Sequence, residues 1–280
     1  MTLTWPVTLA VLFGALLHAS WNVMVKRSGD ALADLALLTM GASLLVMPAL
    51  FFLPLPDTAM WPYLLASNFI HIGYYATLAA TYRHADLSVG YPVMRGSAPL
   101  LVALFGAVVL REVPHTSVWL GIALISGGVV SLAFAQGMRA GAGRAIAFAL
   151  TNATMIATYT LVDAAGARAG DTTLSYVLWM FFLEGLPFAL FMLWRRGRPF
   201  VEHVKKRWPI GFAAGAFSAL SYGIAVWAMT VAPVGAVAAL RETSVVFALG
   251  LGALLLGERV TPRRWLGVAA VLAGAITLRV

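Results

Sequence analysis

A few polar and ionisable residues lie inside long apolar stretches of this sequence, where such groups are costly. Arg95 and Arg241 stand within two of these stretches, and Glu184 stands in the middle of a third. Ionisable groups within a membrane span by default face a cavity or one another. An arginine that lines a cavity suits a carboxylate or phosphate, because its planar guanidinium binds such groups through paired hydrogen bonds. The alternative is internal pairing, of Arg241 with Glu184 or close to Glu242, or a side chain that reaches an interface.

Glu184 has two open interpretations. A lone carboxyl group in an apolar segment can take up and release a proton, which is a functional role. A carboxylate that an arginine holds in a fixed ion pair is a structural feature. The sequence supports both about equally.

Two stripes of histidine, aromatic and amide side chains share one spacing, i, i+3, i+4. The first is His18, Trp21 and Asn22, and the second is His71, Tyr74 and Tyr75. Residues at this spacing lie on one face of a helix. Hydrogen bonding between helices accounts for each histidine taken alone, whereas the two stripes together favour a cavity wall.

The elements that position these residues are predicted to be membrane helices. Hydrophobic residues make up 61% of the 280 residues and charged residues only 11%, against roughly 25% in a soluble domain. Segments of roughly 20 mainly apolar residues can span a bilayer, and they must be helical because lipid cannot satisfy open backbone groups. Ten segments qualify: 4–26, 33–54, 61–83, 88–110, 115–135, 143–165, 172–194, 208–230, 235–256 and 262–279.

The distribution of lysine and arginine predicts the orientation in the membrane. Fourteen of these residues lie on the side of the first loop and 3 on the other side. Cytoplasmic loops carry the excess of positive residues. The first loop and the connection around 195–208 are therefore predicted to be cytoplasmic, with both termini on the opposite side of a cell inner (plasma) membrane.

The chain contains an internal repeat at a shift of 146 residues. With this shift Trp119-Leu120-Gly121 falls on Trp265-Leu266-Gly267, Arg95 on Arg241, and Glu112 on Glu258. The sequence therefore predicts two five-helix repeats, residues 1–140 and 141–280. Because each repeat has an odd number of helices, the second copy is inverted. Inverted repeats are common in alternating-access transporters, whose two halves exchange conformations.

These features resemble the drug/metabolite transporter superfamily, and within it the ten-helix EamA-type permeases. The residues that carry the resemblance are Arg111-Glu112 and Gly257-Glu258, the Trp-Leu-Gly helix starts that follow, Gly128, Gly274, Pro92 and Pro99. The resemblance implies an all-α integral membrane protein with ten transmembrane helices in two inverted five-helix repeats. It also implies a secondary permease or exporter of a small metabolite, such as an amino acid or an organic anion. A flippase, or a flippase subunit for a lipid-linked cargo, is the alternative.

A weaker likeness concerns the first helix. His18 lies eight residues before Lys26. In the small multidrug resistance branch of the superfamily, a membrane glutamate precedes a lysine by the same interval. This likeness implies that His18 occupies the proton-coupling position, with histidine in place of the acid.

The substrate-binding residues that we predict are His18, Trp21, Asn22, His71, Tyr74, Tyr75, Arg95, Glu184 and Arg241. The sequence has none of the common enzyme motifs, such as G-x-S-x-G or H-E-x-x-H, and it has no cysteine. We therefore expect no enzyme activity, no cofactor and no metal. The expected partners are a small-molecule substrate, the lipid bilayer, and a proton or counter-substrate. We expect no nucleic acid, and a monomer or homodimer.

Three further expectations concern local structure. The run Gly90–Gly96 contains residues that break helices and is predicted to expose backbone near the site. Glu112 and Glu258 lie at span ends and are predicted to cap or hold loops. Asp163 is predicted to end the sixth span at an interface.

Overall fold

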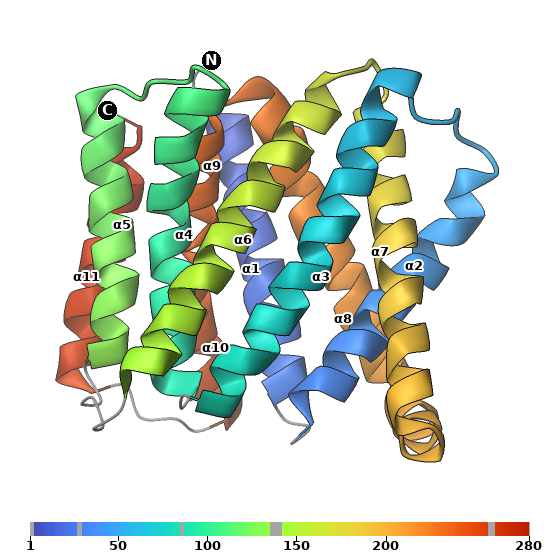
Figure 1. Cartoon of the computed structure of the whole chain (residues 1–280). Helices are drawn as coiled ribbons and strands as arrows, with labels where there is room; N and C mark the ends of the chain where they lie inside the picture. The colour runs from blue at the N-terminus through green and yellow to red at the C-terminus, as the bar shows by residue number, and fades with distance from the viewer. Residues whose placement is uncertain (1–2, 27–29, 85–86, 135–141, 257–260, 280) are drawn as a thin grey trace.

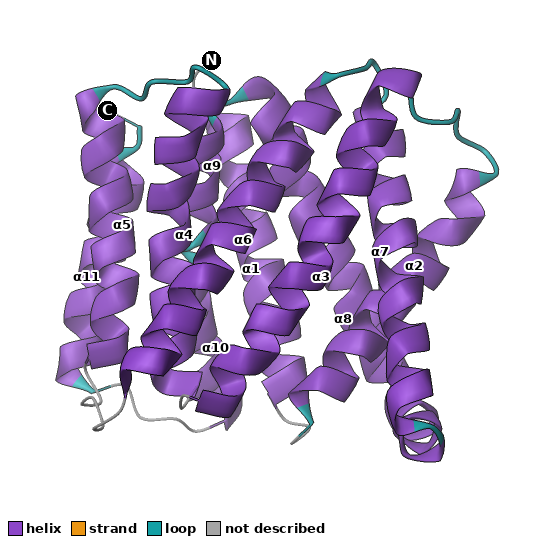
Figure 2. Cartoon of the chain, viewed as in Figure 1, coloured by secondary structure: helices purple, strands orange, loops and turns teal. Residues whose placement is uncertain are grey.

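The computed structural model describes residues 3–26, 30–84, 87–134, 142–256 and 261–279, and these residues form a helical bundle (Figure 1). No strand occurs among them (Figure 2). The helices are α1 Trp5–Lys26, α2 Ala31–Leu50, α3 Trp61–His84, α4 Leu87–Val109, α5 Thr116–Phe134, α6 Ala142–Arg168, α7 Thr173–Arg196, α8 Arg198–Val231, α9 Val234–Arg241, α10 Ser244–Leu256 and α11 Pro262–Thr277. A short 3₁₀ turn, η1 Thr58–Met60, precedes α3.

Each predicted span corresponds to one helix, except that the ninth span is divided into α9 and α10. The helices run between the same two ends of the molecule, with both chain termini at one end (Figure 1). Within the described residues, seven helical stretches are long and apolar enough to cross a membrane unaided. α3 is absent from this group because it carries the second polar stripe, and α5 and α11 are shorter apolar helices. The predicted all-α fold is confirmed.

The helices of the two halves of the chain are interleaved. α1 packs on α8, α3 on α6, α2 on α7 and α8, and α5 on α11. Small residues permit the close approach of α2 and α7, because a Cβ added to Gly185 would lie 2.0 Å from the carbonyl oxygen of Thr39. Next to this crossing the Ser43 hydroxyl donates a hydrogen bond to the Phe181 carbonyl at 2.7 Å.

Glycines of α5 and α11 meet in reciprocal pairs. A Cβ on Gly121 would lie 3.0 Å from the carbonyl oxygen of Gly274, and a Cβ on Gly274 would lie 2.7 Å from that of Gly121. Gly128 and Gly267 show the same relation at 2.8 and 2.9 Å. The predicted close-packing faces of these helices are therefore present. Reciprocal contacts of this kind are what a two-fold relation between residues 1–140 and 141–280 would produce.

The predicted connection around 195–208 is wrong, since most of it is the first part of α8. α7 ends at Arg196, and Gly197 adopts φ +58°, a left-handed conformation that favours glycine. α8 then begins at Arg198, and Phe200 of its first turn is buried against Ala33 and Met192. Burial of this phenylalanine explains why a segment rich in charge is helical.

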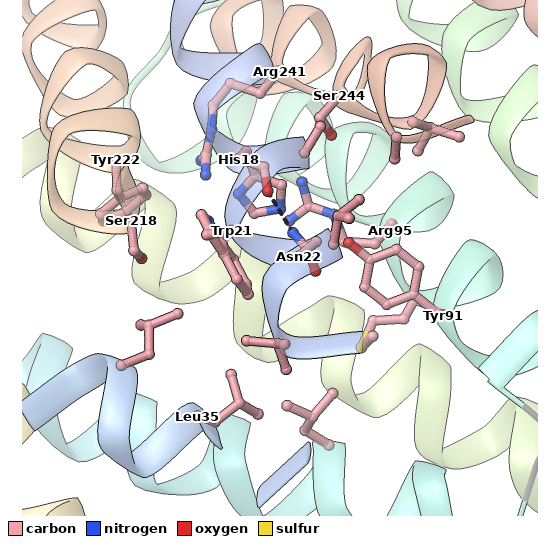
Figure 3. A pocket seen from close by; sticks show the side chains of 18 of the residues that line it. His18, Trp21, Asn22, Leu35, Tyr91, Arg95, Ser218, Tyr222, Arg241 and Ser244 are labelled. Carbon is pink, nitrogen blue, oxygen red and sulfur yellow. Dashed lines mark hydrogen bonds between the residues drawn. The ribbon is translucent and has the colours of Figure 1, made fainter. Parts of the chain in front are cut away.

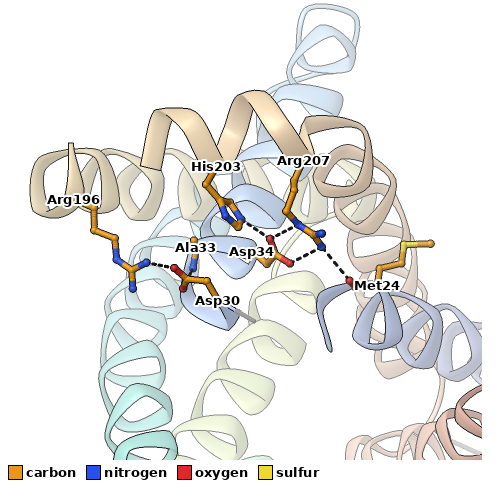
Figure 4. A network of polar contacts seen from close by, with 7 residues as sticks. All are labelled: Met24, Asp30, Ala33, Asp34, Arg196, His203 and Arg207. Carbon is orange, nitrogen blue, oxygen red and sulfur yellow. Dashed lines mark hydrogen bonds and ion pairs between the residues drawn. The ribbon is translucent and has the colours of Figure 1, made fainter. Parts of the chain in front are cut away.

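The first turns of α8 take part in a polar network at the end of the molecule that carries the first loop (Figure 4). Asp34 of α2 accepts hydrogen bonds from Arg207 Nε at 3.0 Å and Nη2 at 2.9 Å, and its Oδ1 lies 2.5 Å from His203 Nε2. Asp30, the N-cap of α2, bonds to the Ala33 amide and to Arg196. Partial burial opposes ionisation of Asp30, but these two hydrogen bonds lower the pKa of its carboxyl group below the ordinary value.

The prediction of exposed backbone around Gly90–Gly96 is also wrong, because α4 remains helical through Pro92 and Pro99. Gly96 is wedged against α5, where a Cβ would lie 2.9 Å from the carbonyl oxygen of Ser126. This contact holds the segment in place.

The helix break occurs instead at the corresponding position of the second half. Glu242 and Thr243 form a turn between α9 and α10. With the shift of 146 residues, Glu242 takes the place of Gly96. A charged side chain that needs a partner thus replaces the glycine that packs against a neighbouring helix.

The end that carries the chain termini is closed. A core cluster that includes Val11, Val102, Met229 and Leu240 fills it. Glu112 Oε1 forms an ion pair with Arg168 Nη1 at 2.6 Å, and its Oε2 accepts a hydrogen bond from the Val234 amide at 2.9 Å. We call these three residues the Glu112 clasp. Glu112 thus holds two connections together, as predicted, whereas Glu258 lies outside the described residues.

Candidate functional site

A cavity of about 520 Å³ lies inside the bundle, within the range of roughly 300–1,000 Å³ that is usual for small-molecule sites. Every helix from α1 to α11 contributes at least one lining residue. All the predicted site residues line it, namely His18, Trp21, Asn22, His71, Tyr74, Tyr75, Arg95, Glu184 and Arg241. Figure 3 shows several of them around His18.

The cavity extends toward the end that carries the first loop. Its lining reaches Val25 in the last turn of α1, Leu132 near the end of α5, and Arg264 near the start of α11. These helix ends lie opposite the chain termini (Figure 1). The cavity therefore lies between the closed core beside the Glu112 clasp and the first-loop end of the molecule.

Arg95 is half of a buried ion pair. Its Nη2 lies 2.8 Å from Glu242 Oε1 and its Nε donates to Glu242 Oε2 at 3.1 Å. The two residues are 7% and 4% exposed. The sequence left open whether Arg95 binds a ligand or pairs internally. The structure shows internal pairing. The partner is the carboxylate that the break between α9 and α10 presents.

Arg241 has a different environment. Its guanidinium carbon lies 4.8 Å from the centre of the Tyr222 ring, a cation–π arrangement. Among the described residues no carboxylate lies within 4.0 Å of it. Figure 3 shows Arg241 and Arg95 on either side of His18, so that their guanidinium groups share the cavity with this ring.

Asp163 holds the Tyr222 ring that lies beneath Arg241. The prediction that Asp163 lies at an interface is therefore wrong. Asp163 is fully buried in α6, which continues to Arg168. Its carboxylate accepts hydrogen bonds from Tyr222 at 2.6 Å and from Tyr176 at 3.0 Å. The prediction failed because α6 extends beyond its predicted end, which leaves Asp163 inside the bundle.

Glu184 is bonded to α3 rather than to an arginine. Tyr75 donates its hydroxyl to Glu184 Oε1 at 2.5 Å, and His71 Nε2 lies 3.8 Å from the same oxygen. Tyr75 is stacked on Phe188 with ring centres 4.3 Å apart. His71 is stacked on Tyr159 at the same separation. Stacking fixes the direction in which both polar groups face the carboxylate.

The first polar stripe forms another part of the wall. The His18 and Trp21 rings meet edge to face at 4.8 Å, and the Asn22 amide donates to the His18 carbonyl at 2.7 Å. The indole N–H of Trp21 is buried and has no acceptor among the described side chains and backbone. The Arg241 guanidinium is a donor group on the cavity wall without a carboxylate partner among the described residues.

Four residues that support the predicted site were not predicted from the sequence to belong to it, namely Glu242, Asp163, Tyr159 and Tyr222. Tyr159 and Tyr222 lie within apolar helices and have the polar hydroxyl that singled out Tyr74 and Tyr75. They lack a histidine at helical spacing, which was the signal for the stripes.

Comparison with known proteins agrees with this fold. Residues 143–280 match the EamA-like transporter family. This half of the chain belongs to that family. A solved crystal structure matches with a TM-score of 0.80 over 98% of this chain and 96% of the other. Its sequence identity of 17% makes this a likeness of fold alone. No curated protein matches the sequence.

The predicted resemblance is thereby confirmed. The match of residues 143–280 makes the protein a multi-pass membrane transporter of the drug/metabolite type. The likeness to the solved structure extends over the whole chain and concerns the fold alone.

Proposed function

We propose that this EamA-like protein is a secondary transporter of a small metabolite that carries a carboxylate, such as an amino acid or an organic anion. The observation that carries the proposal is Arg241, a guanidinium on the cavity wall without a carboxylate partner among the described residues. Cations buried in a membrane protein are normally paired. Arg95 follows this rule through Glu242, whereas Arg241 is held by a ring and leaves its donors for an anion.

The rest of the wall suits a small amphipathic substrate. Aromatic rings from α1, α3, α6 and α8 face the cavity and offer apolar surface. A volume of about 520 Å³ accommodates a molecule of amino-acid size together with water.

Alternating access between two inverted repeats is the proposed mechanism. The reciprocal glycine pairs of α5 and α11 support the two-fold relation. The cavity extends toward the first-loop end, while the Glu112 clasp closes the other end. Since the first loop is predicted to be cytoplasmic, the structure would represent the inward-facing state.

The test is transport into liposomes that contain purified protein, with a panel of labelled amino acids and organic anions chosen by metabolite profiling of overexpressing cells. Arg241→Lys keeps the charge but loses the planar fork, so kcat/KM should fall about tenfold to a hundredfold, as for loss of a charged hydrogen bond. Arg279→Lys is the matched control, because Arg279 also lies over an aromatic ring, that of Trp5, but does not line the cavity. Unchanged transport by Arg241→Lys would contradict the proposed role.

A further inference from the structure

Glu184 is the single acid among the described residues that line the cavity. The other carboxylates nearby are occupied, Glu242 by Arg95 and Asp163 by two tyrosine hydroxyls. Glu184 accepts one hydrogen bond, from Tyr75 to Oε1. Its Oε2 accepts none from the described part of the chain. The cavity therefore holds one carboxylate with room for a further donor.

His71 lies beside the Glu184 carboxylate, and its tautomer determines whether the pair can take up a proton. Its Nδ1 lies 2.8 Å from the carbonyl oxygen of Ser67. A carbonyl oxygen can only accept, so Nδ1 carries the hydrogen and Nε2 of the neutral ring is a lone pair. That lone pair faces Glu184 Oε1 at 3.8 Å. A proton that enters the pair is held either as a carboxylic acid or as an imidazolium beside a carboxylate, and in both cases the charge of the pair rises from −1 to zero.

The charges around the pair do not supply a permanent cation. α3 contributes Tyr75 and His71 themselves, and α8 contributes Tyr222. α6 contributes Tyr159 and the buried Asp163, a carboxylate that interacts electrostatically with His71. The remaining titratable or charged groups of the cavity are His18, Tyr74, Tyr91, Arg95, Arg241 and Arg264. None of the three arginines forms an ion pair with Glu184 within 4.0 Å among the described residues. The charge of Glu184 is therefore left to be balanced by a proton or by a ligand.

We propose that Glu184 binds either a proton or a protonated amine of the substrate, but not both, so that an amine-bearing substrate is exchanged for a proton. The inference rests on the proposed function and deepens it. Arg241 places a positive charge and Glu184 a negative charge on the cavity wall, and the two do not form an ion pair with each other within 4.0 Å. A substrate with a carboxylate and an ammonium group, such as an amino acid, matches both.

The exchange balances in bonds and protons, and with a zwitterionic substrate each cycle moves one net positive charge, that of the proton. When the ammonium group binds, the O–H bond of the Glu184 carboxyl group, or the N–H bond of the His71 imidazolium, breaks and the proton leaves to water in the cavity. When the ammonium group leaves on the other side of the membrane, a proton from water takes its place. One proton thus crosses in the direction opposite to each substrate molecule.

The binding test uses purified protein and two labelled probes that separate the charges, phenethylamine and 3-phenylpropionate, in equilibrium dialysis. The Kd of phenethylamine should rise about tenfold for each unit by which the pH falls below the transition of the pair, because one proton competes. Binding of 3-phenylpropionate should lack this dependence. Glu184→Gln should abolish the competition, while Glu202→Gln, on the exposed side of α8, should keep it. His71→Gln, which retains Glu184, should shift the pH of the transition.

Thermal unfolding of each variant shows whether it is folded. The inference is overturned if folded wild-type protein does not bind phenethylamine, if the affinity does not change with pH, or if Glu184→Gln retains the competition.

A second experiment, in liposomes loaded with a pH-sensitive dye, separates the failure of this inference from the failure of the proposed function. Transport of a metabolite with no proton movement overturns the exchange and leaves the transporter in place. Competition between amine and proton at Glu184, in protein that transports none of the panel, supports the shared binding site at Glu184 but overturns the exchange and counts against the proposed function.

Discussion

At the scale of single residues, the two arginines inside the bundle differ in the group that each one contacts. Arg95 and Arg241 occupy equivalent positions of the repeat, yet one is closed by Glu242 and the other lies over Tyr222. The two arginines could not be told apart from the sequence, because their difference arises in the turn at Glu242. A single turn between α9 and α10 thus pairs Arg95 and leaves Arg241 without a carboxylate partner among the described residues.

Removal of either partner of the Arg95–Glu242 pair should destabilise the protein. A buried charge without its partner costs about 3–5 kcal/mol, so Arg95→Gln and Glu242→Gln should each lower the melting temperature and the yield of folded protein. The double variant Arg95→Gln/Glu242→Gln leaves no lone charge and should recover much of the loss. Scanning fluorimetry in detergent measures all three. If the double variant were as unstable as the sum of the single variants, the pair would not be the cause.

Most of the site could be predicted, because an ionisable or polar aromatic side chain within an apolar span must face inward. That rule placed His18, His71 and Glu184 on the cavity without any knowledge of the packing. It failed for Asp163, which lies so near the end of a span that the rule allowed an interface. Its burial depends on how far α6 continues, which local sequence does not determine.

At the scale of the helices, close packing between glycine faces joins the two halves of the chain. The ten spans were predictable from length and hydropathy, but the helical start of α8 was not, since its first turns are charged and only Phe200 is buried. The break in the ninth span was also missed, because Glu242 looks like an ordinary neighbour of Arg241. In both places tertiary contacts override the local pattern.

Gly127 and Gly128 offer a matched pair to test the contact between α5 and α11. A Cβ on Gly128 would lie 2.8 Å from the carbonyl oxygen of Gly267, whereas a Cβ on Gly127 would meet nothing within 4 Å. Gly128→Ala should therefore cost about 1–3 kcal/mol through overpacking and lower the melting temperature. Gly127→Ala adds a better helix former at an open position and should be neutral or slightly stabilising. Equal melting temperatures of the two variants would show that the two helices do not pack at Gly128 as described.

At the scale of the whole molecule, polar contacts join the halves at both ends. At the first-loop end α2 is bound to α7 and α8 through Asp30, Asp34 and their partners. At the other end the Glu112 clasp joins the segment after α4 to α6 and α9. The cavity between them extends toward the first-loop end. Alternating access would require the clasp to open when the cavity is exposed to the side of the termini.

Weakening of the clasp should therefore raise the population of the state that is open on the side of the termini. Glu112→Gln removes the charge that holds Arg168 but keeps an acceptor for the Val234 amide, so the fold should survive. The chain has no cysteine, so Ala238→Cys, a buried position in the closed core, can report access without background. A charged thiol reagent added on the side of the termini should label this cysteine faster in the Glu112→Gln background. Glu202→Gln, far from the clasp on α8, is the control and should leave the rate unchanged. Equal labelling rates in the two backgrounds would mean that the clasp does not govern opening at this end.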